Sequence, residues 1–145
     1  MREIVTRIDI DAPPAEVWQV LVDFPSYPDW NPLIRFIDGP TEEGAQLNVT
    51  FAPAGLKAKH VRPSVTRMER GRELRFKRRA MLPGLFDREQ AFIVEARGDQ
   101  GTRFVHRERF TGMFAPLFWG DVREQTRLAF ELMNRALKIR AERGE

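Results

Sequence analysis

The 145-residue sequence contains no cysteine. A disulfide, a thiolate nucleophile and a cysteine-ligated metal site are therefore excluded. Only two histidines are present, His60 and His106, and no carboxylates accompany them at the spacing typical of a zinc site, so we expect no bound metal. The glycines are scattered and form neither a phosphate-binding loop nor a nucleophile elbow. We therefore expect no cofactor.

Long hydrophobic runs are also missing. No apolar stretch approaches the roughly 20 residues that a transmembrane helix requires, and residues 1–11 carry charges throughout in place of the apolar core of a signal peptide. We therefore expect a cytoplasmic protein with no transmembrane segment. A chain of 145 residues, 42% of them hydrophobic, is long enough to bury one core, and we expect residues 1–145 to form a single domain.

Lysine is scarce, so the net charge of +3 and the pI of 9.8 come mainly from arginine. One interpretation is a surface that binds nucleic acid or an anionic membrane. The other is a solvated surface of mixed charge, which we favour because 21 acidic residues are interspersed among the basic ones. We therefore expect no nucleic-acid partner. The sequence does not set the oligomeric state.

Residues 116–143 carry the one long helical pattern of the chain. Hydrophobic residues recur there at intervals of three, four or seven, which is typical of an amphipathic helix. The stripe consists of Val122, Ala129, Met133, Ala136, Leu137 and Arg140, and it is widened by Phe130 and Leu132. No proline or glycine interrupts residues 121–143, so the helix should run roughly 30 Å.

The chain before this helix shows mainly the two-residue alternation of β-strands. The expected strands are residues 2–10, 33–37, 47–51, 57–68, 73–81, 86–96 and 102–112. Two short helices are expected after the first strand, one from the Pro13-Pro14 pair to about Asp23 and one at residues 26–30. Tight turns between successive strands favour an antiparallel meander. The predicted fold class is α+β: a curved antiparallel sheet wrapped around a long C-terminal helix.

Two aromatic segments have more than one interpretation. Residues 24–32 contain three prolines and three aromatic residues, and they could either plug the core or form a lid over a cavity. Residues 114–119 form the most concentrated apolar segment. They could anchor the start of the long helix or form the mouth of a cavity opposite Trp30, and we favour the mouth.

A polar group is predicted on the inward faces of the last strands. The alternation places His106 and Glu108 inward on one strand, Gln90 inward on the neighbouring strand and Arg78 inward on the strand beyond it. A few polar groups in an otherwise apolar cavity would orient a ligand. His106, with an ordinary pKa of about 6.5, could exchange a proton near neutral pH, with Glu108 setting its charge. Alternatively, His106 with Glu108, or an Arg78–Glu108 pair, serves the structure alone.

Several segments of the sequence resemble the START-like, or SRPBCC, superfamily of helix-grip folds, and within it the polyketide cyclase/dehydrase and lipid-transport group. They are residues 8–18 (IDIDAPPAEVW), 27–32 (YPDWNP), 86–92 (FDREQAF) and 101–112 (GTRFVHRERFTG). Such relatives often read Phe-Asp-Gly-Glu-His where this chain has Arg88 and Gln90 in place of the glycine and the histidine. The resemblance implies the helix-grip fold. It implies no shared catalytic motif, because this fold hosts cyclases, lipid carriers, hormone receptors and chaperone cofactors.

We predict that the protein binds, and could transport or sequester, a small hydrophobic molecule such as a lipid, polyketide or isoprenoid, without turning it over. The predicted ligand contacts are Trp30, Phe51, Phe76, Arg78, Gln90, Phe92, Phe104, His106, Glu108, Phe110, Phe118 and Met133. One alternative is a cyclase or dehydratase that uses His106 and Glu108 as catalytic acid–base groups. The other is an interaction module, a chaperone cofactor or toxin-like binder, that uses the arginine-rich outer faces of the strands.

Overall fold

The computed structural model of the protein describes residues 2–79 and 84–144. Its elements are β1 (Arg2–Ile10), α1 (Pro14–Val22), the 3-10 helix η1 (Phe24–Ser26), α2 (Tyr27–Trp30), β2 (Ile34–Asp38), β3 (Asn48–Phe51), β4 (Lys59–Val61), β5 (Ser64–Glu69), β6 (Glu73–Arg79), β7 (Asp87–Arg97), β8 (Gly101–Thr111) and α3 (Ala115–Arg143). The order agrees with the predicted α+β fold class, and the two short helices follow the first strand as expected.

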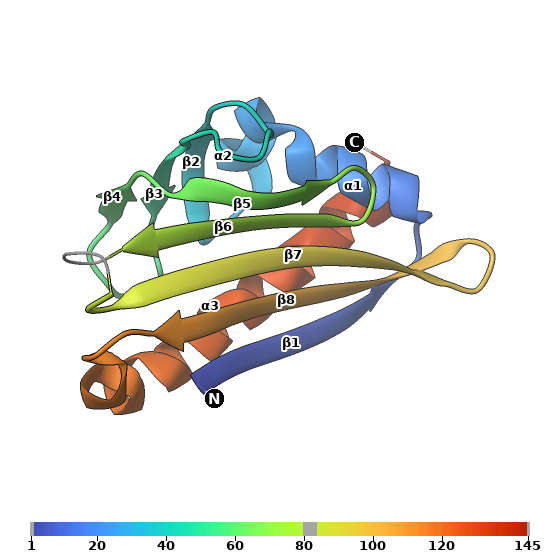
Figure 1. The fold of residues 1–145 in the computed structure, drawn as a ribbon. Helices are drawn as coiled ribbons and strands as arrows, with labels where there is room; N and C mark the ends of the chain where they lie inside the picture. Colours follow the sequence, from blue (N-terminus) through green and yellow to red (C-terminus); the bar gives the residue numbers. More distant parts are fainter. Residues whose placement is uncertain (1, 80–83, 145) are drawn as a thin grey trace.

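The strands form two antiparallel sheets. The larger sheet has the order β1-β8-β7-β6-β5 and curves in front of α3, while β2, β3 and β4 form a smaller sheet (Figure 1). An isolated bridge between Gln46 and Ser64 connects the two sheets. The meander prediction therefore holds for β5 to β8 and for β2 to β4, whereas β1 joins the far edge of the large sheet beside β8.

The register of β7 and β8 directs their alternate side chains towards α3. Gln90 lies opposite Glu108, and Phe92 lies opposite His106. All four side chains are buried, which confirms the predicted inward faces of both strands. Because side chains alternate with a period of two, a slip of one residue would have turned all of them to solvent.

Helix α3 covers the concave face of the large sheet. Its buried residues are Ala115, Thr126, Ala129, Phe130, Met133, Asn134, Leu137 and Ala141. The predicted stripe is therefore confirmed at Ala129, Met133 and Leu137, but Leu132 is 46% exposed. Leu132 lies about 100° around the helix from Met133, which turns it away from the sheet. The helix ends at Arg143, and Gly144, with a positive φ of 72°, provides a left-handed cap.

The predicted strand at residues 57–68 is wrong as a single element. It is split into β4 and β5, which belong to different sheets. Pro63 lies between them and cannot donate to a strand ladder, so the chain changes sheets at this residue. The other described strands begin and end within two residues of their predicted limits. The predicted strand end at Ala80 and Met81 lies outside the described residues.

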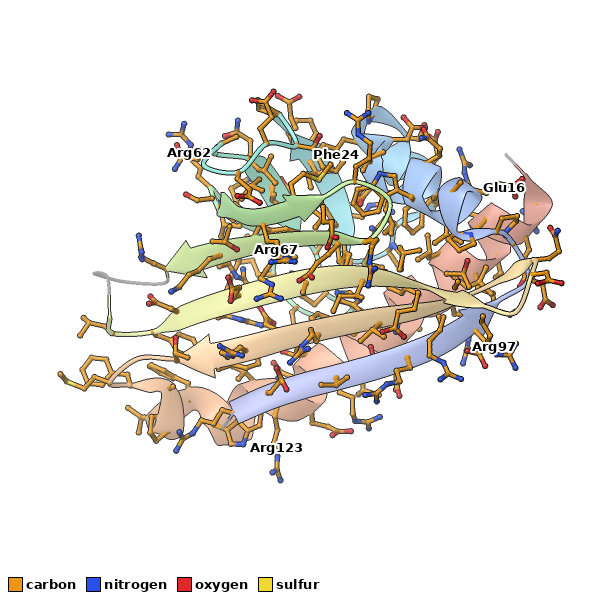
Figure 2. The ribbon with its side chains drawn as sticks, turned by 45° about the vertical axis from the view of Figure 1, so that its right-hand side comes forward. Glu16, Phe24, Arg62, Arg67, Arg97 and Arg123 are labelled. Atoms are coloured by element: carbon orange, nitrogen blue, oxygen red, sulfur yellow. The ribbon has the colours of Figure 1, made fainter. Side chains whose placement is uncertain are left out.

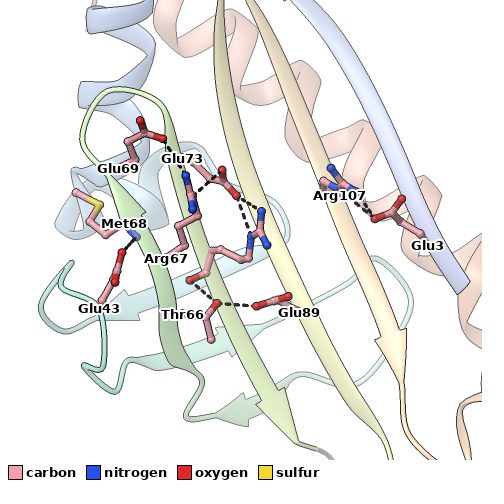
Figure 3. Close-up of polar contacts among 10 residues, drawn as sticks. Glu3, Glu43, Thr66, Arg67, Met68, Glu69, Glu73, Glu89 and Arg107 are labelled. Atoms are coloured by element: carbon pink, nitrogen blue, oxygen red, sulfur yellow. Dashed lines mark hydrogen bonds and ion pairs between the residues drawn. The ribbon is translucent and has the colours of Figure 1, made fainter. Parts of the chain in front are cut away.

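The outer face of the large sheet carries charges of both signs. Arg67 lies 3.2 Å from Glu73 and 3.3 Å from Glu69, and Arg107 pairs with Glu3 (Figure 3). Such exposed pairs contribute little to stability, on the order of 0 to 1 kcal/mol each. They do place a carboxylate beside these arginines, so this face is a mixed-charge surface.

Other arginines are spread around the molecule. Arg62, Arg97 and Arg123 project from separate edges (Figure 2). Arg97 and Arg103 both pair with Asp9, at 3.2 and 3.1 Å. Arg62, Arg97 and Arg123 therefore do not form a single basic patch.

Candidate functional site

A cavity of about 120 Å³ lies between the concave face of the sheet and α3. The strands β6, β7 and β8 contribute the polar side chains Arg78, Arg88, Gln90 and Glu108. The remaining lining residues are Leu33, Phe51, Pro53, Leu56, Lys57, Lys59, Val122, Gln125, Thr126, Ala129 and Phe130. The arrangement is an apolar wall with a small polar group on the sheet, which is typical of a ligand site.

The cavity reaches solvent between the segment after β3 and the first half of α3. Leu56, Lys57 and Gln125 line it there and are exposed. Two surface depressions of about 490 and 480 Å³ adjoin it, because they share lining residues with it. The enclosed volume is below the roughly 300 to 1,000 Å³ typical of ligand pockets. A ligand of ordinary size would therefore extend into these depressions.

Among residues 2–79 and 84–144, Glu108 is the one carboxylate that lines the cavity. Its two oxygens accept hydrogen bonds from Arg88 Nε at 3.1 Å and Arg88 Nη2 at 2.9 Å. Arg88 Nη2 also donates to Thr126 Oγ1 of α3 at 3.2 Å, and the guanidinium lies 4.8 Å from the centre of the Phe110 ring. The side chain of Glu108 is 1% exposed and that of Arg88 is 16% exposed. The pair is therefore buried, bidentate and tied to the helix.

The Arg78–Glu108 pair, one of the structural alternatives, does not form, because Glu108 pairs with Arg88. Arg78 lies on β6, which is separated from β8 by β7, whereas Arg88 lies on the adjacent strand. On adjacent strands, diagonal neighbours two residues apart lie within reach of long side chains. Arg88 faces the cavity two residues before Gln90, the register partner of Glu108, and it therefore makes the ion pair.

Arg78 has a different environment. Its guanidinium lies 4.4 Å from the centre of the Phe51 ring, and its Nε is buried without a hydrogen-bond partner. Among the described residues, no carboxylate forms an ion pair with it within 4.0 Å. Burial and then the charge of Arg88 lower the pKa of Arg78 to about 10, while Glu108 opposes the shift. Arg78 therefore remains a cation at neutral pH.

His106 is held in a chain of buried hydrogen bonds. Thr6 Oγ1 donates to the main-chain oxygen of His106 at 3.0 Å, and Asn134 Nδ2 donates to Thr6 Oγ1 at 2.8 Å. Asn134 Oδ1 must then accept from His106 Nδ1, which lies 3.0 Å away. His106 Nε2 consequently accepts from Gln90 Nε2 at 2.6 Å. The network assigns the proton of a neutral imidazole to Nδ1.

The prediction that His106 exchanges a proton near neutral pH is wrong. Burial lowers the pKa of His106 to about 3, and the hydrogen bond with Asn134 opposes this shift only in part. The Phe130 ring stacks on the imidazole with 3.6 Å between ring centres. Glu108 does not set its charge, because it bonds Arg88 and not His106. His106 is not among the residues that line the cavity.

The structure brings four of the predicted contact residues to the cavity: Phe51, Arg78, Gln90 and Glu108. The other candidates pack elsewhere in the described part of the chain. Phe76, Phe92, Phe104 and Met133 are buried in the core, with 5.6 Å between the ring centres of Phe76 and Phe92 and 5.9 Å between those of Phe92 and Phe104. Ligand contact by any of these residues stays a prediction.

The two aromatic segments do not form the mouth of this cavity. Trp30 packs edge-on against Tyr27, with 5.2 Å between ring centres. The ring centre of Phe118 lies 5.2 Å from that of Phe86, just before β7, and the ring centre of Trp119 lies 5.2 Å from that of Phe110 on β8. These contacts anchor the start of α3. The mouth lies instead beside residues 53–57. The favoured interpretation of residues 114–119 as a cavity mouth is therefore corrected to an anchor.

Sequence reasoning missed two groups of lining residues. Ala129 is on the predicted stripe of α3 but is not among the predicted ligand contacts, and Thr126 lies on the same face at three-to-four spacing, which could have identified it. Leu56, Lys57 and their neighbours after β3 follow no periodic pattern, so no comparable signal marked them.

Neither a metal site nor a membrane-spanning helix is found in the part of the chain that the structure describes. Over residues 2–79 and 84–144, no group of three or more histidine, aspartate or glutamate side chains is placed to hold a metal ion. None of the helices in these ranges has the length and apolar character needed to span a bilayer.

Known proteins share this fold. No curated protein sequence matches the chain. Similar solved structures include a START superfamily protein from Mycobacterium smegmatis (17% identity, 97% of each chain covered, TM-score 0.74) and the protein TTHA0849 from Thermus thermophilus (18% identity, 96% of each chain, TM-score 0.73). The Zhui aromatase/cyclase from Streptomyces sp. R1128 is 19% identical over 98% of this chain and 94% of its own, with a TM-score of 0.69. Identities this low show the fold alone. The model of one family, described as polyketide cyclase / dehydrase and lipid transport, matches residues 1–142, and the chain therefore belongs to that family.

Proposed function

We propose that the protein binds a small, mainly hydrophobic molecule in the cavity between the large sheet and α3. The observation that carries this proposal is the cavity itself, which combines an apolar wall with a few polar groups on three adjacent strands. Membership of a family described by polyketide cyclases and lipid transport supports the same class of ligand, such as a lipid, a polyketide or an isoprenoid.

The affinity would come mainly from the wall. Phe51, Val122, Ala129 and Phe130 offer apolar surface, and burying about 100 Å² of apolar ligand surface contributes roughly 2.5 kcal/mol. A larger ligand would bind more tightly by burying further apolar surface in the depression between Leu56 and α3. The polar groups would fix its orientation, because a buried polar group without a partner is costly.

Binding without turnover is proposed in preference to catalysis. One structural relative is an aromatase/cyclase, so acid–base chemistry is the alternative. A general acid or base must reach the substrate and titrate near the working pH. His106 does neither, because it lies outside the cavity lining and its pKa is about 3. Glu108 reaches the cavity but is held by Arg88 through both oxygens.

The test is a pair of tryptophan substitutions on α3. Val122→Trp places a large ring at the cavity wall, and Ile139→Trp, at an exposed position that does not line the cavity, is the matched control. Native mass spectrometry of the freshly purified proteins detects any ligand carried along. Fluorescence titration with Nile red, a neutral apolar dye, measures binding directly.

We expect the wild type and Ile139→Trp to bind the dye, and Val122→Trp to bind it at least about tenfold more weakly, a difference of about 1.4 kcal/mol. A bound hydrophobic molecule should be present in the first two proteins and reduced in the third. The proposal fails if the wild type is free of adduct and does not bind the dye. It also fails if both tryptophan variants bind the dye as well as the wild type does.

A further inference from the structure

The charged side chains that line the cavity are unequal in sign. Of the described lining residues, Arg78, Arg88, Lys57 and Lys59 are cationic, and Glu108 alone is anionic. Arg88 engages both oxygens of Glu108, so that one negative charge is already matched. The cavity and its mouth therefore present positive charge to whatever enters.

Among these cations, Arg78 is the one whose surroundings indicate what the cavity binds. It faces the Phe51 ring and has a buried Nε with no hydrogen-bond partner. A partly buried cation beside a second cation is unfavourable unless water, an anion or another hydrogen-bond acceptor offsets it. Its neighbour across the β6–β7 register is Arg88, a like charge. Among the described residues, the chain itself supplies Arg78 with no carboxylate partner.

Gln90 adds a second donor at the same place. It lines the cavity, and its amide nitrogen is held by His106 Nε2 at 2.6 Å. An amide nitrogen carries two hydrogens, so one remains for a ligand. Because Asn134 and Thr6 fix the tautomer and the ring of His106, they also fix the orientation of Gln90. His106 is thus a positioning residue for Gln90.

We propose that the ligand of this cavity is a carboxylic acid with an apolar body, and that Arg78 and Gln90 bind its carboxylate. This inference rests on the proposed function and names the chemical class of its ligand. Guanidinium groups match carboxylates in shape and form strong, charge-assisted hydrogen bonds with them. The apolar body lies along Phe51, Val122 and Phe130, and the exposed lysines at the mouth attract the acid before it enters.

The test compares an acid with its neutral isostere. Cinnamate and cinnamamide share one apolar body and differ in the charge of the head group, so the ratio of their dissociation constants isolates the carboxylate. Both are titrated into the full-length protein at neutral pH and low ionic strength, with NMR chemical shifts as the readout. The variants are Arg78→Gln and Arg78→Lys. The control is Arg75→Gln, which alters an arginine of the same strand that pairs with Glu73 away from the cavity.

We expect the wild type and Arg75→Gln to bind cinnamate about tenfold or more tightly than cinnamamide. Arg78→Gln should lose that preference, because its affinity for cinnamate should fall much more than its affinity for cinnamamide or for Nile red. Arg78→Lys keeps the charge and should keep part of the preference, which also guards against a folding defect in the glutamine variant. Raising the salt concentration should weaken the binding of cinnamate but not that of cinnamamide.

Two results would overturn the inference in distinguishable ways. If the acid and the amide bind the wild type equally, and Arg78→Gln changes neither, then the anionic head group is wrong while the proposed function stands. If cinnamate, cinnamamide and Nile red all fail to bind the wild type, then the proposed function has failed and the inference falls with it.

Discussion

The buried imidazole of His106 should make the stability of the protein depend on pH in a defined direction. Its pKa is about 3 in the folded protein and about 6.5 in an unfolded chain. Between these two values the unfolded chain binds a proton that the folded protein does not. The free energy of unfolding should therefore fall as the pH is lowered through this window, and the contribution should be fully present above about pH 6.5.

The expected magnitude is large for a single group. Between the two pKa values, the extra proton bound by the unfolded chain lowers the free energy of unfolding by about 1.4 kcal/mol per pH unit. Acidification from pH 6.5 to pH 5 should therefore lower it by roughly 2 kcal/mol. The whole window represents on the order of 4 to 5 kcal/mol, against a total stability of about 5 to 15 kcal/mol for a typical domain. The upper half of the window is the informative part, because ordinary carboxylates titrate near pH 4 and contribute little above pH 5.

Urea unfolding at several pH values between about 5 and 7 measures this dependence. His106→Gln cannot ionise, and His60→Gln removes the exposed histidine of β4 as the matched control. We expect the wild type and His60→Gln to lose stability in parallel as the pH falls. His106→Gln should be less stable at neutral pH by about 1 to 3 kcal/mol, because its hydrogen-bond partners are disturbed, but nearly independent of pH. If His106→Gln keeps the slope of the wild type, the assignment of that slope to His106 is wrong.

Two further changes test the site and the start of α3. Glu108→Gln leaves the buried Arg88 without a counter-charge and should destabilise the fold by about 3 kcal/mol in thermal unfolding. Replacing both Glu108 and Arg88 with methionine should recover much of this loss. An unchanged unfolding midpoint in Glu108→Gln would contradict the argument. Gly112 has a φ of 110°, and a Cβ there would lie 2.5 Å from the main-chain oxygen of Leu85. Gly112→Ala should therefore lower the free energy of unfolding by at least about 1 to 3 kcal/mol. Gly120 lies in open space within the helix, so Gly120→Ala should stabilise the protein by about 0.5 to 1 kcal/mol. Equal effects of the two alanines would refute the steric explanation.

The fold could be predicted because local and global signals agree. Buried and partly buried residues alternate in β8 from His106 to Phe110, and the spacing of Ala129, Met133 and Leu137 in α3 is helical, so each element has one face to bury. The same alternation placed Glu108 inward. A sheet with one long helix after it has few ways to cover its concave face, and the structure uses the simplest of them.

The details of the site could not be predicted in the same way. The partner of Glu108 depends on how three strands align, and periodicity along one strand carries no information about that alignment. Asn134 is polar, and a polar residue of an amphipathic helix is expected to be exposed. It is buried instead, because its side chain pairs with His106. Whether Phe92 fills the core or lines a cavity depends on side-chain volumes in three dimensions, and here it fills the core.

The ion pair of Glu108 with Arg88 and the unpaired Nε of Arg78 favour binding of a ligand over its turnover. For Glu108 to accept a proton from a bound molecule, Arg88 would have to release both carboxylate oxygens and its bond to Thr126. This change would leave a buried carboxylate without its counter-ion, and breaking such a pair costs several kcal/mol. Arg78 needs no such rearrangement, because its Nε has no hydrogen-bond partner to give up. An anionic ligand can therefore engage Arg78 while the Glu108–Arg88 pair stays intact, and this difference in cost favours a site that holds its ligand unchanged.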